Sequence, residues 1–597
     1  MNPVITQVTQ RILQRSQETR QRYLQRIEQQ LQRGKSRAHL SCGNLAHTVA
    51  TCCPAQKQTI LDFTTINVGI ISAYNDMLSA HAPYLDYPTQ IKQTLAKLGH
   101  SAQVAAGVPA MCDGITQGQE GMDLSLFSRD LIAQATAVGL SHNTFDAALL
   151  LGICDKIAPG QLMGALSFGH LPTAFVPTGP MTTGISNKEK VSIRQQYAAG
   201  KLGKDALQAM ENAAYHSNGT CTFYGTANTN QLVFEAMGLM LPGSAFVPVN
   251  SPLRPLLTDL ISQQMIKISR NGSDFRPLAK VVDEKSLVNG LVALLASGGS
   301  TNHTMHMVAV ARAAGFIINW DDFAELSTAV PLLAKVYPNG SADVNEFHQA
   351  GGVPLLLKRL AERDLLHLDA TPIYGTMQDY FMMPTLVDGK LIYQQITDTA
   401  NPDVIVPQGK VFSAQGGLKV VDGNLGRGVI KISAVAPEHR KITAPAIVFE
   451  EQEDVVAAYK QGELQQNAVI VVRNSGPAAR GMPELHQLMP ILGNLMEQGF
   501  QVALVTDGRL SGASGKVPSI IHISPESSKG GPLAYLQTGD MVEIDAEQGI
   551  LRCLNELQGR KAVTVDLSAD YQCSGRELFT LFRKNISSAE EGATILY

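Results

Sequence analysis

The sequence predicts an α/β fold: an N-terminal open α/β domain with a parallel sheet, followed by a smaller, β-rich, barrel-like C-terminal domain. In the first half of the 597-residue chain, apolar strand-like runs alternate with helical patterns, and each run ends in a loop with Gly or Pro. After about residue 411 the runs become short and β-branched, with Gly turns between them. At ~150 residues per domain, the length also predicts more than one unit.

The N-terminal segment 5–32 is rich in Gln and Arg, and its apolar residues recur at near-helical spacing. This pattern predicts an amphipathic surface helix that packs on the body of the protein or on a partner subunit. A transit peptide is the alternative, but Glu18 and Glu28 argue against it because such leaders contain few acidic residues. We expect residues 1–60 to form a helical extension of the N-terminal domain.

The elements of the N-terminal domain follow from periodicity. Apolar, β-branched runs indicate buried strands, and apolar residues spaced three to four apart indicate helices. Residues 316–366 look mostly helical. The strand candidates are Asn67–Ser72 and Ala147–Ile153, and the helix candidates are Asp130–Leu140 and Lys204–Tyr215.

A loosened pattern between residues 369 and 407, with recurring Pro and Gly, marks the domain boundary. We expect an N-terminal domain over 1–385 and a C-terminal domain over 386–597. One strong helix, Pro483–Gln498, is predicted in the second domain. Its strand candidates are Lys419–Val421, Gly428–Ile432, Ala446–Phe449, Ala468–Val472, Val502–Thr506, Met541–Ile544 and Lys561–Val565.

Composition narrows the function classes. The chain has 48 basic and 52 acidic residues, for a net charge of −4, whereas nucleic-acid proteins carry a strong basic excess. No run approaches the ~18 apolar residues that cross a bilayer. The eight cysteines are sparse and form no CxxC pair, so a disulfide framework is not expected. Without a secretory signal, we expect a cytoplasmic protein that binds neither nucleic acid nor membrane.

Two clusters of chemically active residues lie in the first domain. Cys112-Asp113-Gly114 places a carboxylate before a Gly, where the backbone obstructs a ligand little, although Asp-Gly is more often a plain turn. Cys154-Asp155-Lys156 follows an apolar run and therefore lies at a predicted strand end. Thiolates suit iron and carboxylates suit magnesium, so a neighbouring Cys and Asp could serve two metal centres. The alternative is a buried Cys beside a surface Asp–Lys pair.

Three further clusters complete the pattern. Cys221 stands among small and hydroxyl residues in 219–230, which leaves room for a bulky ligand, although the segment could equally be a polar helix start. Pro483-Glu484 is also an ordinary helix-start signature. Ser511 lies between Leu and Gly on a tight turn after a predicted strand. No P-loop, HExxH or Rossmann fingerprint occurs.

Together, these clusters resemble the dihydroxy-acid dehydratase / phosphogluconate dehydratase family of iron–sulfur dehydratases. The similarity runs from about Asn67 to Pro525, and five motifs stand in the family's order. Other matching segments are 297–302 and 423–425. Segments that look like the 6-phosphogluconate branch of the family are 106–121, 127–130, 168–172 and 215–231.

The resemblance implies an iron–sulfur cluster, expected to be 4Fe-4S in this branch. Cys154 and Cys221 match cysteines that bind the cluster in the family. Relatives place a third cluster cysteine where this chain has Ala80. Cys112, beside the first acidic motif, is our candidate to replace it.

The resemblance also implies magnesium. Asp113, Asp155 and Glu484 match magnesium ligands, and Lys156 matches a lysine that is carbamylated in relatives and contributes an oxygen to the metal. Ser511 matches the proposed general base. Ser511 and Lys156 are therefore the expected catalytic residues.

The implied reaction removes water from 6-phospho-D-gluconate to give 2-dehydro-3-deoxy-6-phospho-D-gluconate, a step of the Entner–Doudoroff route, in an enzyme expected to be a homodimer. Two rivals remain: a related dehydratase of an unphosphorylated sugar acid or dihydroxy acid, and a non-catalytic iron–sulfur sensor. A sensor needs no magnesium carboxylates. A phosphate site could be supplied by Lys188, Lys190, Arg194 and Arg254, although such charges are usually solvated.

Overall fold

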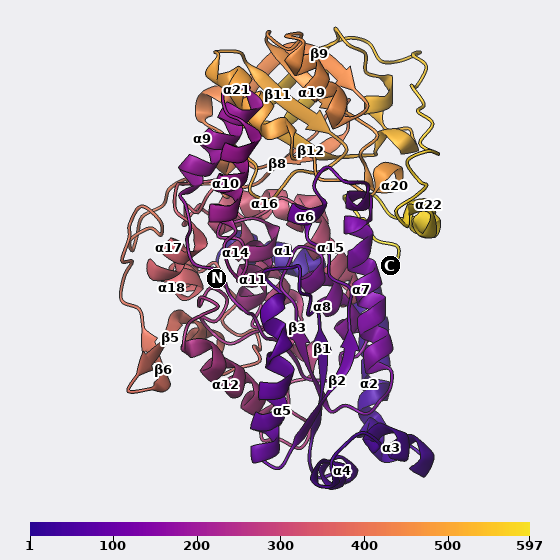
Figure 1. Ribbon diagram of the computed structural model, residues 1–597, viewed down its shortest axis with the longest axis vertical. Coiled ribbons are helices and arrows are strands. Elements are labelled where there is room, and N and C mark those ends of the chain that lie inside the picture. The colour runs from indigo at the N-terminus through magenta and orange to yellow at the C-terminus, as the bar shows by residue number, and fades with distance from the viewer.

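A computed structural model describes residues 1–597. Its first sheet has four parallel strands in the order β2-β1-β3-β4, and it lies in the lower half of the molecule between α5 (Tyr87–Lys97) and α7 (Ser125–Leu140) (Figure 1). Every residue of β1, β3 and β4 is buried, as expected for a parallel sheet covered on both faces. The predicted parallel α/β sheet is thus confirmed. Its strands are β1 (Asn67–Ser72), β2 (Ser101–Gly107), β3 (Ala147–Leu151) and β4 (Thr173–Phe175).

The strand order places β2 and β3 on opposite sides of β1, so the chain changes direction across the sheet at β1. In open α/β sheets, ligands bind beyond the carboxyl ends of the strands at such a switch point. The loops after β1, β2 and β3 therefore converge on one edge of the sheet. Those loops contain Ala80, Asp113 and Asp155 respectively.

Helix α8 (Ile157–Leu166) packs directly against α7, and two glycines make this possible. A Cβ on Gly160 would lie 2.5 Å from the Arg129 carbonyl oxygen, and one on Gly164 would collide with the Ala133 carbonyl. All residues of α8 are buried, so the helix forms the central layer of the core. The close packing fixes the turn between β3 and α8, which carries Cys154 and Asp155.

Further helices complete the first region. The buried ones are α11 (Thr226–Ala236), α14 (Glu284–Ser297) and α15 (His303–Ala313). The others are α3 (Cys42–Val49), α4 (Pro54–Leu61), α6 (Asp113–Thr116), α9 (Asn187–Ala198), α10 (Lys204–Ala214), α12 (Leu253–Lys267), α13 (Leu278–Val281), α16 (Trp320–Ala329), α17 (Val344–Gln349) and α18 (Gly352–Ala361). No helix in the structure has both the length and the apolar character needed to cross a membrane.

The N-terminal segment forms two helices that pack on the body of the same chain, α1 (Pro3–Arg15) and α2 (Gln17–Gln32). The apolar face of α1 is fully buried against the core. Arg11 and Arg15 both pair with Asp322, at the start of α16, and the Tyr23 hydroxyl donates to the Leu166 carbonyl at 2.9 Å. The predicted amphipathic helix is therefore present, and it packs on its own chain.

The chain stays with the first region beyond residue 385. After a hairpin of β5 (Met382–Val387) and β6 (Lys390–Gln395), isolated bridges join Ala334 to Ile405 and Leu332 to Ser413. A Cβ on Gly417 would lie 2.6 Å from Gly298 Cα, so the backbones are in contact there. The core changes only at Lys419. A division at residue 385 into separately folding domains stays a prediction.

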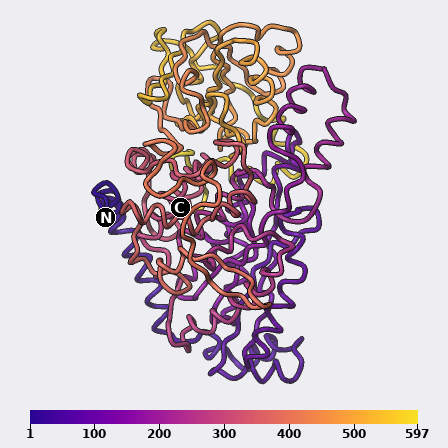
Figure 2. Tube along the Cα trace, turned by 90° about the vertical axis from the view of Figure 1, so that its left-hand side faces the viewer, coloured from indigo at the N-terminus to yellow at the C-terminus, as the bar shows by residue number.

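The second sheet has eight strands in the order β14-β13-β9-β10-β11-β12-β8-β7 and nearly closes into a barrel above the first region (Figures 1 and 2). Its edges meet where Leu551 N–H donates to the Asp422 carbonyl at 3.0 Å. The predicted barrel-like fold is confirmed. The strands are β7 (Lys419–Val421), β8 (Arg427–Ile430), β9 (Lys441–Phe449), β10 (Ala468–Val472), β11 (Val502–Thr506), β12 (Ser519–Ser524), β13 (Met541–Asp545) and β14 (Ile550–Cys553).

Strand residues alternate between two cores in the barrel. Val469 and Val471 of β10 belong to the barrel's own core of 20 buried residues. Ile470 and Val472, which point the other way, join the large core that extends from the first region. Both faces of β10 are therefore apolar. The surrounding helices are α19 (Gln452–Lys460), α20 (Pro477–Arg480), α21 (Leu488–Glu497) and α22 (Thr580–Asn585).

After the barrel, the C-terminal tail returns to the first region. The Phe579 and Phe582 rings lie 5.9 and 5.6 Å from the ring of Phe127 in α7. Farther along, Thr594 Oγ1 donates to Asp130 Oδ2 at 2.7 Å, and Arg129 donates to the Ala593 carbonyl at 2.6 Å. The chain therefore crosses between the regions twice.

Two predicted elements of the second region are wrong. Lys561–Val565 alternates like a strand, but it pairs with no strand of the barrel. The helix predicted from Pro483 begins only at Leu488, because Glu484 instead forms a β-bridge with Arg509. Pro483 is therefore not a first helical residue. Strands β12 and β14 and helix α19 were not predicted.

Candidate active site between the two sheets

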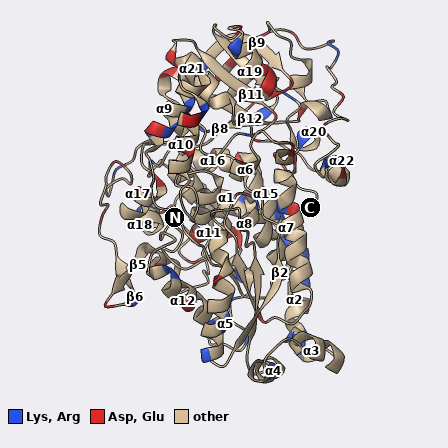
Figure 3. Cartoon of the chain, viewed as in Figure 1, with Lys and Arg blue, Asp and Glu red and all other residues tan.

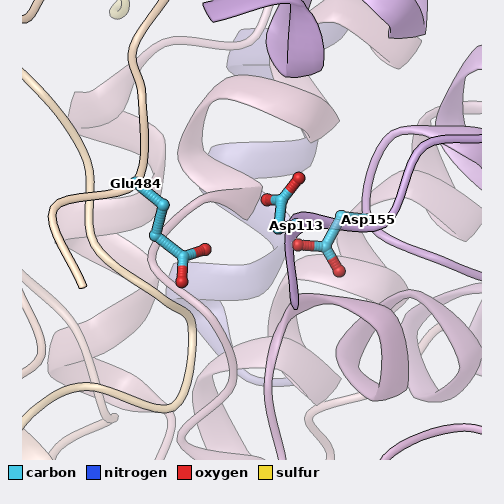
Figure 4. Close-up of side chains that lie close together, drawn as sticks. All are labelled: Asp113, Asp155 and Glu484. Atoms are coloured by element: carbon cyan, nitrogen blue, oxygen red, sulfur yellow. The ribbon is translucent and has the colours of Figure 1, made fainter. Parts of the chain in front are cut away.

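Three carboxylates from distant parts of the chain meet at the carboxyl edge of the first sheet. Asp113 begins α6 after β2, Asp155 lies in the turn between β3 and α8, and Glu484 comes from the barrel side. One oxygen of each lies within 4.8 Å of the others (Figure 4). Carboxylate oxygens are hard ligands that suit magnesium, so the donor set fits this ion. The structure thus brings the three predicted acids together.

Two buried cations neutralise these acids. Lys156 Nζ donates to Asp113 Oδ2 at 2.5 Å and lies 3.6 Å from Asp155 Oδ2. Arg509 donates to Asp113 Oδ2 at 2.9 Å and to Glu484 Oε2 at 3.2 Å, so it bridges the two regions. Sequence reasoning missed Arg509, although it stands two residues before Ser511 in a motif that was singled out.

The pKa values of the three acids diverge. Burial alone would raise the pKa of Asp113, but the charges of Lys156 and Arg509 hold it below the usual range. Burial raises the pKa of Asp155, and the nearby Asp113 charge raises it further. Burial, with the charges of both aspartates, raises the pKa of Glu484 to about 7. Three acids this close cannot all ionise readily unless cations balance them.

Neighbouring side chains orient two of the acids. Gln117 Nε2 donates to Glu484 Oε1 at 2.8 Å, across the interface between the regions. Ser125 Oγ, at the start of α7, donates to Asp113 Oδ1 at 2.5 Å. Each carboxylate thus keeps a fixed direction, as metal ligands do when a second layer of hydrogen bonds holds them.

Two of the three candidate cluster cysteines, Cys112 and Cys154, directly precede Asp113 and Asp155 in the chain. Burial raises the pKa of Cys154, and charges on Cys112, Asp155 and Cys221 raise it further. Burial and charges on Cys112 and Asp155 likewise raise the pKa of Cys221 to about 12. Free thiols are therefore neutral here. Thiols are the donors that iron–sulfur clusters use, so the chemistry of these residues fits such a cluster.

The sequence predicted that Cys154 and Asp155 lie at the end of a strand, and this prediction is wrong. Strand β3 ends at Leu151, and the two residues belong to the tight turn that leads into α8. The backbone N–H of Ile153 donates to His81 Nε2 at 3.1 Å. Burial lowers the pKa of His81 to about 3, so the ring is neutral and its nitrogen can accept. His81 is a positioning residue that sequence reasoning missed.

The segment containing Ala80 lies between the loops of Cys154 and Cys221. The backbone N–H of Gly219 donates to the Ser79 carbonyl at 2.7 Å, and Thr178 Oγ1 donates to the Ala80 carbonyl at 2.8 Å. Ala80 is buried, and its methyl group offers no ligand. Cys112 therefore stays the candidate for a third thiol.

Ser511 belongs to a barrel loop that packs on the first region. Asn302 Nδ2 donates to the Leu510 carbonyl at 3.2 Å, and a Cβ on Gly512 would lie 2.7 Å from the Thr226 amide nitrogen. Ser511 and Lys431 line the same small cavity, and Lys431 Nζ donates to the Gly512 carbonyl at 2.6 Å. Burial lowers the pKa of Lys431 to about 7. The role of Ser511 as a base stays a prediction.

The four candidate phosphate residues differ in environment. Arg254 is buried, and its guanidinium donates to the carbonyls of Val247 and Pro177, so it is a structural residue. Arg194 is held by two hydrogen bonds to Glu211, at 2.7 and 2.8 Å. Lys188 is exposed, whereas Lys190 is buried.

The candidate active site lies between a parallel α/β region and a barrel, with acids and cations from both regions and thiols from the first. Two family models match the chain: the dihydroxy-acid/6-phosphogluconate dehydratase N-terminal model over residues 66–380 and the C-terminal model over residues 403–593. The chain belongs to the dihydroxy-acid/6-phosphogluconate dehydratase family, and it is therefore a dehydratase, a hydro-lyase.

Curated relatives extend over the whole chain. The phosphogluconate dehydratase of Escherichia coli K12 is 54% identical over 601 residues, covering 100% of both proteins. That of Zymomonas mobilis is 51% identical over 602 residues, covering 100% of this chain and 99% of the relative. The dihydroxy-acid dehydratase of Ignicoccus hospitalis is 34% identical, covering 83% of this chain and 88% of the relative.

Proposed function

We propose that this enzyme dehydrates 6-phospho-D-gluconate to 2-dehydro-3-deoxy-6-phospho-D-gluconate and water. The observation that carries the proposal is the meeting of Asp113, Asp155 and Glu484 within 4.8 Å, beside three cysteines, in a chain with full-length relatives that are phosphogluconate dehydratases. The reaction breaks the C2–H and C3–O bonds and forms an enol that tautomerises to the 2-keto acid.

The three acids and Lys156 would hold magnesium, and Cys154, Cys221 and Cys112 would hold the iron–sulfur cluster. When bound, magnesium supplies charge stabilisation at the substrate carboxylate, and a cluster iron supplies Lewis acidity at the C3 hydroxyl. A hydrogen next to a carboxylate is a poor acid because its removal concentrates negative charge, so this stabilisation supports the chemistry.

Lys156 contributes in either of two forms. As an ammonium, it neutralises Asp113 through their 2.5 Å contact. As a carbamate, it would provide a fourth oxygen to the metal, as the family resemblance implies. The change from cation to anion would leave Arg509 as the remaining cation in contact with Asp113.

Ser511 would accept the C2 proton at Oγ. A serine alkoxide needs a partner that stabilises its charge or takes its proton. Lys431 lines the same cavity and is suited to this role. Because Ser511 comes from the barrel and Asp155 from the first region, contact between the two regions would be required for proton removal.

Turnover assays test the proposal directly. The enzyme should release a 2-keto acid from 6-phosphogluconate much faster than from D-gluconate or from a branched 2,3-dihydroxy acid. Chelation should abolish this activity, and magnesium should restore it. Faster turnover of an unphosphorylated acid would instead assign the enzyme to another branch of the family, and no turnover of any of these acids would favour a sensor.

The enzyme is further proposed to be a cytoplasmic homodimer, since the family resemblance implies this assembly. Light scattering of the purified protein should give about twice the 64.1 kDa chain mass. A monomer that remains fully active would contradict this assignment.

A further inference from the structure

One buried lysine in the structure contacts neither a carboxylate nor a backbone carbonyl. Lys190, in α9, has 5% of its surface exposed. Its Nζ has a single hydrogen-bond contact, with Thr222 Oγ1 at 3.5 Å, and no carboxylate lies within 4.0 Å. An ammonium removed from water is costly unless a partner compensates for the lost hydration. Lys190 is therefore poised to receive an anion.

The other buried cations show how unusual this environment is. Every other buried Lys or Arg donates to a carboxylate or to a backbone carbonyl. Lys431, for example, is equally buried but donates to the Gly298 and Gly512 carbonyls. The other buried cations therefore do not explain why Lys190 is buried without such a partner.

Lys190 lies beside the segment that carries Cys221, because its contact Thr222 directly follows that cysteine. Helix α11 links the same segment to the acids. Its Asn228 donates to the Cys221 carbonyl at 2.7 Å, and its Asn230 donates to the Asp155 carbonyl at 3.1 Å. A substrate with its carboxylate at the acids could therefore place its other end toward Lys190.

Helix α9 also packs against the barrel helix α21. Figure 2 shows a purple segment near residue 200 that rises beside the barrel, and charges of both signs lie on α9 in Figure 3. Asn494 Nδ2 of α21 donates to the Gln195 carbonyl at 3.2 Å, and Gln195 Nε2 donates to Glu497 at 2.8 Å. These contacts hold Lys190 at the interface of the two regions.

We propose that Lys190, together with the Thr222 hydroxyl, binds a phosphate monoester at the substrate end opposite the carboxylate. The inference deepens the proposed function and depends on it. Arg194 does not replace Lys190, because Glu211 already engages its guanidinium. A phosphate oxygen would give the lysine the charged partner that it lacks, and the hydroxyl would add a second donor. Lys190 would thereby select phosphorylated over unphosphorylated sugar acids.

The test compares Lys190→Gln with Lys188→Gln, a matched variant two residues away on the exposed face of α9. In Lys190→Gln, kcat/KM for 6-phosphogluconate should fall roughly 10- to 150-fold, mainly through KM, because a hydrogen bond to a charged group is lost. The value for D-gluconate should stay unchanged. Lys188→Gln should resemble the wild type with both substrates. Lys190→Arg should recover part of the loss.

Binding measurements keep the inference separate from the proposed function. Iron content and thermal midpoint of Lys190→Gln should equal those of the wild type, and calorimetry should show weaker binding of 6-phosphogluconate. Equal losses with both substrates, or unchanged 6-phosphogluconate binding, would overturn the inference while the proposed function stands. If the wild type turns over only unphosphorylated acids, the proposed function fails. In that case, calorimetry with inorganic phosphate decides whether Lys190 binds phosphate. If the wild-type protein does not bind inorganic phosphate, the inference about Lys190 is overturned as well.

Discussion

The two sheets of the molecule use the same topological rule to build opposite halves of one site. In the first sheet, Asp113 and Asp155 follow the carboxyl ends of the parallel strands β2 and β3. In the barrel, Glu484 and Arg509 lie in the loops after the parallel strands β10 and β11. The carboxyl ends of both sets of strands face the same interface. Parallel strands thus supply functional loops in the barrel as well as in the open sheet.

The two halves differ in what their acidic motif residues do. Asp155 of the first sheet lies among the metal-binding candidates. Asp507, which directly follows barrel strand β11, is fully buried and accepts backbone N–H bonds from Asn474, Ser475 and Ser527 at 3.1, 2.9 and 2.9 Å. Asp507 therefore holds loops together, whereas Asp155 is available to a ligand. An Asp that follows a strand therefore does not reveal which of these roles applies.

The largest expected effect concerns the thiols, which only the first region contributes. Cys154→Ser and Cys221→Ser should each lose iron and at least about 100-fold in activity, since even residues that merely orient metal ligands cost 10- to 100-fold. Metal analysis and circular dichroism should show iron loss with the fold retained. Cys42→Ser, at an exposed cysteine, is the control. Full iron retention in either variant would remove that residue from the cluster, and iron loss in Cys112→Ser would identify the third thiol.

The barrel's contribution to chemistry is tested at Ser511. Ser511→Ala should reduce kcat by about 10²- to 10⁴-fold, the usual cost of removing a general base. Exchange of the C2 hydrogen with deuterated solvent should slow in parallel. Iron content should not change, because Ser511 is not among the proposed cluster ligands. A near-normal kcat would mean that another group removes the proton and that the barrel contributes only binding.

The contrast between the two aspartates gives a paired prediction. Asp155→Asn should keep the cluster colour and lose most turnover, because it weakens magnesium binding. Asp507→Asn should instead lower the free energy of unfolding by about 1–3 kcal/mol, since an amide accepts fewer of the three backbone bonds. Urea unfolding and magnesium titration separate the two outcomes. Magnesium affinity reduced equally in both variants would show that the distinction between the two motifs is false.

The last prediction concerns the pH dependence of stability, which changes gradually from one pH unit to the next. The pKa of Lys431 is about 7 in the folded protein and 10.5 when unperturbed, so between these values the unfolded chain binds the extra proton. The contribution of Lys431 to the free energy of unfolding should therefore rise with pH from 7 to about 10, by at most ~1.4 kcal/mol per pH unit. In urea unfolding of metal-free protein, Lys431→Met should lack this rise. Parallel pH profiles for the two proteins would contradict the shifted pKa.

Local patterns predicted the fold well wherever strands are uniformly apolar. Strands β1, β10 and β11 match their predicted limits, because runs such as Ala468–Val472 are buried on both faces. Strand β12 was missed because Ser and His interrupt it, and its burial depends on the first region. Lys561–Val565 alternates correctly but finds no partner strand. Pairing is a tertiary property, and alternation alone does not supply it.

The sequence predicted those site residues whose roles are visible in a local motif. The sequence pointed to Asp113, Asp155 and Glu484, and the structure brings them together. The sequence did not predict that Arg509 and His81 belong to the site, because each acts through a contact with a distant segment of the chain. The assigned roles of the cysteines and of Ser511 stay predictions.

The two chain crossings between the regions have a mechanical consequence. One crossing enters the barrel at Lys419, and the other leaves it through the tail that Asp130 anchors. Two attachments restrict the movement of the barrel relative to the first region more than one attachment would. An opening of the interface would separate Arg509 from Asp113, whose 2.9 Å contact joins the two regions. If ions and substrate entered by such an opening, entry would require breaking this ion pair, and salt concentration should change the rate of metal uptake.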